Sequence, residues 1–163
     1  MCISTMSLAQ WTVLGDSYVS SPTSHQSMAI SDENVPYVAF KDGSVDGRTS
    51  VIKLVDNQWE NVGEPGFSSE GFFGTDYHSL TFDSQGTPYV AFRDLNDGSK
   101  PSVMKFTGLN WEYVGSAGFT TGAVSYVKMA IGPDDGIYIT FREASLADKT
   151  SVLKFNGTDW EYI

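Results

Sequence analysis

The feature that most restricts the fold of this chain is an internal repeat. Residues 27 to 63, 79 to 115 and 128 to 163 align with one another without a gap. In each copy an apolar residue stands 31 residues before a tryptophan, and the three pairs are Met28 and Trp59, Leu80 and Trp111, and Met129 and Trp160. Because chance does not produce this register three times, the chain is a tandem array of one structural unit.

Each copy contains four short apolar segments separated by turn residues, a pattern that predicts four β-strands. In the first copy these are residues 27 to 31, 37 to 40 and 50 to 54, and a strand that starts at Trp59. The copies differ in length only between the tryptophan strand and the next copy, where surface loops tolerate insertions. We therefore expect an all-β chain with almost no helix, built from four-stranded antiparallel blades.

The second predicted strand of each copy is apolar on both of its faces. In the first copy Tyr37 and Ala39 point to one side, and Val38 and Phe40 point to the other. Such a sheet must be covered on both faces, and stacking the blades around an axis achieves this. The repeat therefore predicts a β-propeller. A β-sandwich is the alternative, but it does not predict three copies without gaps.

Three copies are too few for a closed propeller ring, because propellers typically have four to eight blades. Either this chain is a fragment of a longer protein or identical chains associate. The favoured arrangement is a homodimer that closes a six-bladed ring around a twofold axis. Residues 1 to 15 are predicted to form an N-terminal tail plus an extra strand, because the run from Trp11 to Gly15 matches the tryptophan strand of the other copies.

The strand order, the repeat length and the tryptophan that opens the last strand resemble kelch-type propellers. The paired glycines of the second kelch strand are replaced by Ala39-Phe40 and Ala91-Phe92. The turns before the tryptophans resemble the Asp-box of sialidase-like propellers through Gly108 and Gly157, without its Ser and Asp positions. The repeat is also similar to those of uncharacterised bacterial propeller proteins. This resemblance implies an architecture and no activity.

The composition excludes several classes of partner. Twenty acidic residues against ten basic ones give a net charge of −10, which repels the phosphate backbone of nucleic acids. No apolar run reaches the roughly 18 residues that a membrane-spanning helix needs. With Cys2 as its single cysteine, the chain cannot form an intrachain disulfide. We expect no nucleic acid, membrane or cofactor partner.

Two sets of residues recur at equivalent positions and form the candidate ligand-binding site. A basic residue followed by an acidic one ends the second strand of each copy, as Lys41-Asp42, Arg93-Asp94 and Arg142-Glu143. At the axial mouth of a ring these cations could bind an anionic ligand such as a carboxylate sugar, while the favoured interpretation of the repeated pairs is ion pairing between neighbouring blades. Aromatic side chains stand just before the first strand, on a predicted loop where they could stack on a sugar ring or pack against the loop itself. They are His25, Tyr77 and Tyr126.

The sequence predicts no metal site. His25 and His78 occupy non-equivalent positions, without further ligands at the spacing that zinc requires. Loops such as residues 42 to 47 offer oxygen ligands but lack the spacing of a calcium-binding loop, so turn formation is favoured. The three repeated tryptophans are predicted to pack within the structure.

No phosphate-binding loop, nucleophile elbow or distinct pair of carboxylates appears in the sequence. The favoured interpretation is a non-catalytic binding or scaffold protein whose ligand is a glycan. The alternatives are a hydrolase that acts on polysaccharides and a truncated repeat module without activity of its own.

Overall fold

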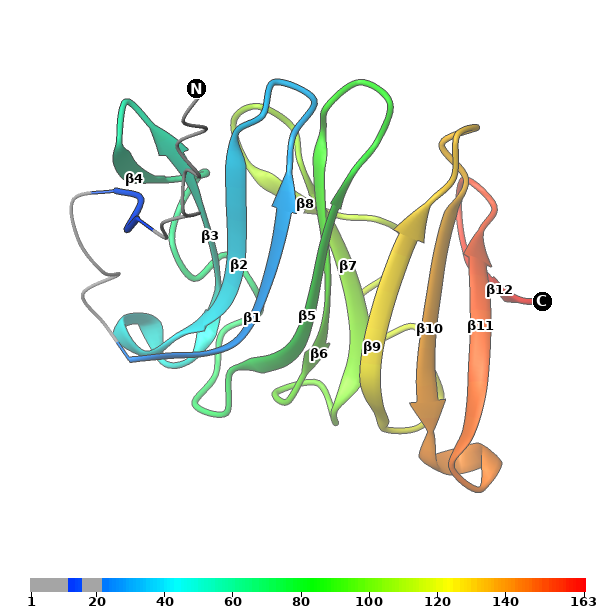
Figure 1. Ribbon diagram of the computed structural model, residues 1–163. Helices are drawn as coiled ribbons and strands as arrows, with labels where there is room; N and C mark the ends of the chain where they lie inside the picture. Colours follow the sequence, from blue (N-terminus) through cyan, green and yellow to red (C-terminus); the bar gives the residue numbers. More distant parts are fainter. Residues whose placement is uncertain (1–11, 16–21) are drawn as a thin grey trace, which may run out of the picture.

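The computed structural model describes residues 12–15 and 22–163, and it forms three four-stranded antiparallel sheets that stand side by side (Figure 1). The first sheet contains β1 (Thr23–Ile30), β2 (Pro36–Asp42), β3 (Arg48–Val55) and β4 (Gln58–Asn61). The second contains β5 (Thr75–Phe82), β6 (Pro88–Asp94), β7 (Lys100–Phe106) and β8 (Trp111–Tyr113). The third contains β9 (Val124–Ile131), β10 (Ile137–Glu143), β11 (Lys149–Phe155) and β12 (Trp160–Tyr162). The predicted all-β fold with four strands in each copy is confirmed.

Each sheet follows chain order from its first strand to its fourth. The first strand β5 contacts β1 on one side and β9 on the other, so the first strands form the edge along which neighbouring sheets come closest. This is the arrangement of propeller blades. Within residues 12–15 and 22–163 the helical segments are the single 3₁₀ turns η1 (Gly43–Val45) and η2 (Ala144–Leu146), and neither is long enough to span a bilayer.

The core lies between neighbouring sheets, because each sheet packs one apolar face against the opposite face of the next. One cluster joins the first and second sheets through Ala39, Val51, Val62, Leu80, Val90, Phe92, Met104 and Trp111. A second cluster joins the second and third sheets through Tyr89, Ala91, Val103, Val114, Val127, Met129, Ile137, Ile139, Phe141 and Leu153. Burying each large apolar side chain contributes about 1.5 to 3 kcal/mol, so these interfaces hold the sheets together.

The repeated tryptophan connects each sheet to the one before it. The indole Nε1 of Trp111 donates to the carbonyl oxygen of Val62 at 2.7 Å, and that of Trp160 donates to Val114 at 2.9 Å. The following glycines, Gly63 and Gly115, have positive φ, and a Cβ on either would lie 3.2 Å from the indole Nε1. The tryptophans therefore have the packing role that the repeat predicts.

The N-terminal segment makes the same contact with the first sheet. Gly15 has a φ of +82°, and a Cβ there would lie 2.6 Å from the Nε1 atom of Trp59. Of the predicted extra strand, Trp11 lies outside the described residues, and residues 12 to 14 are not in a strand. The chain's own Gly15 thus takes the place that Gly63 and Gly115 take on the later sheets.

Candidate functional site

A β-bulge interrupts the first strand of every sheet at the same place. The register of β1 with β2 shifts between Ser24 and Ser27, and that of β5 with β6 shifts between Asp76 and Ser79. The third sheet shows the same shift opposite β10. The bulge residues have left-handed backbones, with φ values of 55°, 50° and 58° at His25, Tyr77 and Tyr126. A non-glycine residue pays about 1 to 3 kcal/mol for such a conformation, and bulges commonly redirect a side chain.

The bulges bring the predicted aromatic residues into one row. The ring centroids of His25 and Tyr77 are 5.8 Å apart, and those of Tyr77 and Tyr126 are 5.2 Å apart. The expectation that these residues lie on a loop is wrong, because they belong to β1, β5 and β9. The polar residues around the bulge break the alternation of apolar and polar positions, so the sequence pattern does not indicate a strand there.

The predicted cations lie at the same end of the sheets as the aromatic row. The guanidinium carbon of Arg93 is 4.7 Å from the ring centroid of Tyr77, and that of Arg142 is 5.4 Å from that of Tyr126. These four side chains line one cavity of about 210 Å³. Lys41 lies on the first sheet, where its Nζ donates to the carbonyl oxygen of Phe73 at 2.9 Å.

Arg93 is held by contacts within the protein. Its Nε and Nη2 atoms donate to the two carboxylate oxygens of Asp76 at 2.7 and 2.5 Å, and Nη1 donates to the carbonyl oxygen of Val124 in the third sheet at 3.1 Å. The hydrogen bonds that Arg93 donates to Asp76 raise the pKa of Arg93 above its ordinary value. Arg93 therefore joins neighbouring blades through a backbone carbonyl, and its ion pair lies within its own blade.

Arg142 is more open. Its side chain is 48% exposed, and its Nε donates to Ser125 Oγ at 3.1 Å. The same Nε lies 3.5 Å from Asp148 Oδ1, and Asp148 has a left-handed backbone with a φ of 62°. Tyr126 beside it is 60% exposed. The same cavity is thus lined by an aromatic ring, hydrogen-bond donors and a carboxylate, which belong to Tyr126, Arg142, Ser125 and Asp148.

The acidic partners in the predicted basic-acidic pairs are buried in the blades. Ser50 Oγ donates to Asp42 at 2.8 Å, and Ser151 Oγ donates to Glu143 at 2.9 Å. Asp94 accepts from the hydroxyl of Ser69 and from the backbone N–H of Asn96. These carboxylates hold the loop after the second strand, and they belong to the architecture and not to the open cavity.

Sequence reasoning missed Asp76, Ser125 and Asp148. Asp76 and Ser125 stand in the same aligned column, directly before the tyrosines, and a comparison of that column would have found them. Asp148 follows a loop whose course the repeat does not specify. Among the described residues no group of three or more histidine, cysteine or acidic side chains is placed to hold a metal ion.

His78 is buried between the first and second sheets. Its Nδ1 lies 2.9 Å from the carbonyl oxygen of His25, so Nδ1 carries a proton and donates it. Its Nε2 lies 3.1 Å from the hydroxyls of Thr49 and Thr75 and accepts from one of them, while the two hydroxyls are 2.8 Å apart and hydrogen-bond to each other. Burial lowers the pKa of His78 to about 4, so the ring is neutral at pH 7. This residue connects sheets, and its side chain does not line the cavity beside Tyr126.

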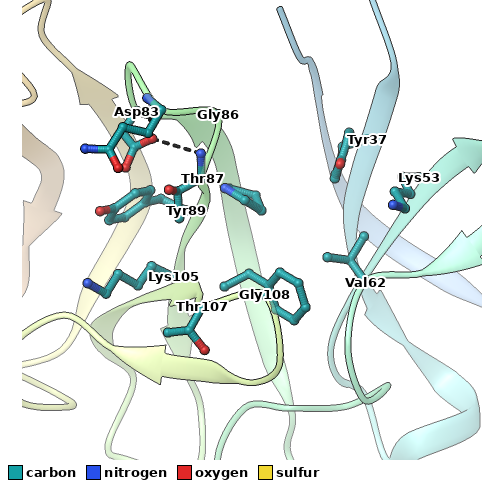
Figure 2. Close-up of a pocket in the computed structure, with 13 residues that line it drawn as sticks. Tyr37, Lys53, Val62, Asp83, Gly86, Thr87, Tyr89, Lys105, Thr107 and Gly108 are labelled. Atoms are coloured by element: carbon teal, nitrogen blue, oxygen red, sulfur yellow. Dashed lines mark hydrogen bonds between the residues drawn. The ribbon is translucent and has the colours of Figure 1, made fainter. Parts of the chain in front are cut away.

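A larger cavity of about 660 Å³ opens at the opposite end, between the first and second sheets. Figure 2 shows Tyr37, Lys53 and Val62 of the first sheet across this opening from the turn that carries Asp83 and Thr87. Between the second and third sheets the corresponding turns are joined, because Ser84 donates through its N–H and its hydroxyl to Asp135, at 2.8 and 2.6 Å.

The aligned positions between the first and second sheets are Asp32 and Gly86. Gly86 has no side chain that could accept such bonds. The opening therefore follows from a missing connection between two turns.

No protein-family model matches this sequence, and the comparison with curated proteins gives no match. Among solved structures, a fucose lectin from Kordia zhangzhouensis is 13% identical with a TM-score of 0.55, covering 85% of this chain and 96% of the lectin chain. A protein of unknown function from Dyadobacter fermentans is 16% identical with a TM-score of 0.61, covering 92% of this chain and 56% of that one. The GH93 α-L-arabinofuranosidase of Fusarium graminearum is 11% identical with a TM-score of 0.60, covering 91% of this chain and 50% of the enzyme.

At these identities the likeness is one of fold. The chain shares a β-propeller-like architecture with proteins named as a lectin and a glycosidase. It spans nearly the whole length of the lectin chain and about half of the other two.

Proposed function

We propose that this chain is a non-catalytic β-propeller module that binds a glycan at the cavity lined by Tyr77, Tyr126 and Arg142. The observation that carries the proposal is the bulge that holds a tyrosine in a strained backbone conformation beside an arginine. Strain of this kind persists where the surrounding structure enforces it, and it gathers at ligand sites. His25 and Lys41 form the corresponding place on the first sheet.

The chemistry of the cavity suits a sugar. The apolar C–H face of a sugar ring packs on an aromatic side chain, while charged groups hydrogen-bond the hydroxyls. Tyr126 offers the exposed ring, and Arg142 and Asp148 offer a donor and an acceptor next to it. The fold shared with a lectin chain of similar length supports this assignment. The kelch-type and sialidase-like resemblance of the repeat contributes the architecture and no activity.

The number of carboxylates that line the cavity favours glycan binding over glycan hydrolysis. Glycoside hydrolysis usually needs two carboxyl groups on either side of the scissile bond. Among the described residues that line this cavity, Asp148 is the single carboxylate. Asp76 lies nearby but is bonded to Arg93 through both of its oxygens.

The test is a glycan array followed by titration calorimetry on the wild-type chain and on Tyr126→Gly. Glycine accepts the left-handed backbone at this position, so the variant should fold while its affinity for the selected glycan falls at least tenfold. Equal affinity in the two proteins would remove the site from this cavity. Release of reducing ends from the selected glycan would instead favour the hydrolase.

We further propose that two chains close a six-bladed ring. The outward face of the third sheet carries Tyr138 and Thr140, which are partly exposed, whereas the equivalent Tyr89 and Ala91 of the second sheet are buried against the third. On the first sheet the outward Met28 is 65% exposed. Packing the third sheet of one chain against the first sheet of the other would cover both faces.

The closing contact would differ in detail from those inside the chain. Ser27 and Ser79 accept hydrogen bonds from the N–H groups of Leu80 and Met129 in the next sheet, at 3.0 Å each. Lys128 stands at the equivalent position of the third sheet and cannot accept such a bond.

A further inference from the structure

The two arginine positions differ in one cross-strand partner. Asp76 lies opposite Arg93 in the register of β5 with β6, and Ser125 lies opposite Arg142 in the register of β9 with β10. Each partner directly precedes the bulge tyrosine of its strand. The same geometry therefore supplies a carboxylate to one arginine and a hydroxyl to the other.

This difference leaves Nη2 of Arg142 without the carboxylate partner that Nη2 of Arg93 has. Nη1 of Arg93 bonds to the following sheet, and in the described part of the chain no sheet follows the third one to do the same for Arg142. Arg93 uses all three nitrogens for hydrogen bonds inside the protein. Arg142 uses Nε for Ser125, and within the described residues its two Nη atoms have no hydrogen-bond partner. The approach of Asp148 at 3.5 Å joins two half-exposed side chains, and exposed pairs of this kind contribute at most about 1 kcal/mol.

We propose that the Arg142 site takes a carboxylate-bearing sugar, a uronate, whose carboxylate serves Arg142 as the Asp76 carboxylate serves Arg93. This inference rests on the proposed glycan-binding function and specifies its ligand class. The planar guanidinium group binds a carboxylate through two parallel hydrogen bonds, which a neutral hydroxyl cannot reproduce. Tyr126 lies under the guanidinium group and extends the site toward the sugar ring.

Because the chain carries a net negative charge, selective binding of a uronate is a specific test for a local positive site. A net charge of −10 repels an anionic ligand over most of the surface, so binding of a uronate requires a local positive site. Asp76 neutralises Arg93 within the protein, whereas the carboxylate paired with Arg142 in the described part of the chain is the half-exposed Asp148. The first sheet offers Lys41, whose compact ammonium group lacks the bidentate geometry.

The experiment measures the affinity of the chain for a glucuronic acid oligosaccharide and for a neutral glucose oligosaccharide of the same length. The wild-type chain should bind the uronate at least tenfold more tightly. Ser125→Asp places the Asp76 type of partner opposite Arg142, and it should weaken uronate binding at least tenfold. Because the variant copies a pair that exists in the second sheet, it should retain the fold.

Ser24→Asp is the matched control. Ser24 lies opposite Lys41 in the register of β1 with β2, so this substitution adds the same charge at the equivalent place of the first sheet. It should change uronate affinity by less than about threefold. Arg142→Lys provides a second variant with unchanged charge. It should weaken uronate binding at least tenfold, because lysine lacks the planar guanidinium group that forms two parallel hydrogen bonds with a carboxylate.

The outcomes separate the two proposals. Equal binding of both oligosaccharides, or equal losses in Ser125→Asp and Ser24→Asp, would overturn the uronate inference and leave glycan binding intact. Absence of binding to any saccharide by the folded wild-type chain would overturn both. Selective uronate binding that only Ser125→Asp and Arg142→Lys remove would support the inference.

Discussion

His78 shows at the scale of one residue how a polar side chain joins two sheets. Its buried ring donates a hydrogen bond to a backbone carbonyl and accepts one from a pair of hydrogen-bonded threonine hydroxyls. Every polar atom of the ring is satisfied in the neutral form, so burial costs little as long as the ring stays uncharged. The aligned residues in the other copies are Gln26 and Val127, so this device is specific to the interface between the first and second sheets.

This arrangement predicts a stability that depends on pH. The pKa of His78 is lowered to about 4 in the folded chain, against an ordinary value of 6.5. The unfolded chain therefore binds the proton more readily, and the free energy of unfolding falls as the pH drops from about 6.5 to about 4. The loss between pH 7.5 and pH 5 should be about 2 kcal/mol from this residue.

The measurement is urea unfolding at both pH values for the wild-type chain and for His78→Gln, which places the residue of the first copy at this position. The variant should be less stable at pH 7.5, and its own pH dependence should be smaller by about 2 kcal/mol. Parallel pH dependences would contradict the role assigned to His78, because carboxylates contribute equally in the two proteins.

At the scale of elements, the loop between the first and second sheets is fixed by one close backbone approach. Gly74 has a φ of +71°, and a Cβ on it would lie 2.1 Å from the carbonyl oxygen of Gly47. The N–H of Thr75 donates to that same carbonyl at 2.9 Å. This contact sets the start of β5 and therefore the position of the Tyr77 bulge.

Gly74→Ala should destabilise the chain more than Gly86→Ala. Both glycines have positive φ, but a Cβ at Gly86 meets nothing within 4 Å, so that variant isolates the backbone strain of about 1 to 2 kcal/mol. At Gly74 the clash with the backbone adds to this strain, and we expect a total loss of at least about 3 kcal/mol. Thermal or urea unfolding of the two variants measures the difference, and equal losses would rule out the close approach as a constraint.

The sequence predicted the elements better than the site, for a physical reason. Repeated apolar runs and turn residues fix where strands such as β2 and β6 form, so aligning the copies was sufficient. The bulges at His25, Tyr77 and Tyr126 depend on a backbone conformation that side-chain identity does not encode. The alignment therefore picked out aromatic residues and cations that the structure brings together, but it put the aromatic residues on loops. It also missed Asp76, whose importance appears only once it faces Arg93 across the strands.

At the scale of the whole molecule, the proposed ring requires a further contact at each end of the stack of sheets. The third sheet ends in an outward face that includes Ala130, Tyr138 and Val152. Ala130 is exposed, so a larger residue there does not disturb the core of the chain. The charge of −10 on each chain opposes association, and this opposition weakens as salt screens it.

Light scattering over a range of concentrations should give a mass near twice 17.8 kDa, and the dimer should strengthen when salt is added. Ala130→Arg places a long charged side chain on the outward face and should shift the chain toward the monomer. Leu109→Arg adds the same residue on the turn before β8, where Leu109 is 77% exposed, and should leave the mass unchanged. A wild-type mass of 17.8 kDa at every concentration would rule out the ring, because the two outward faces would then remain uncovered.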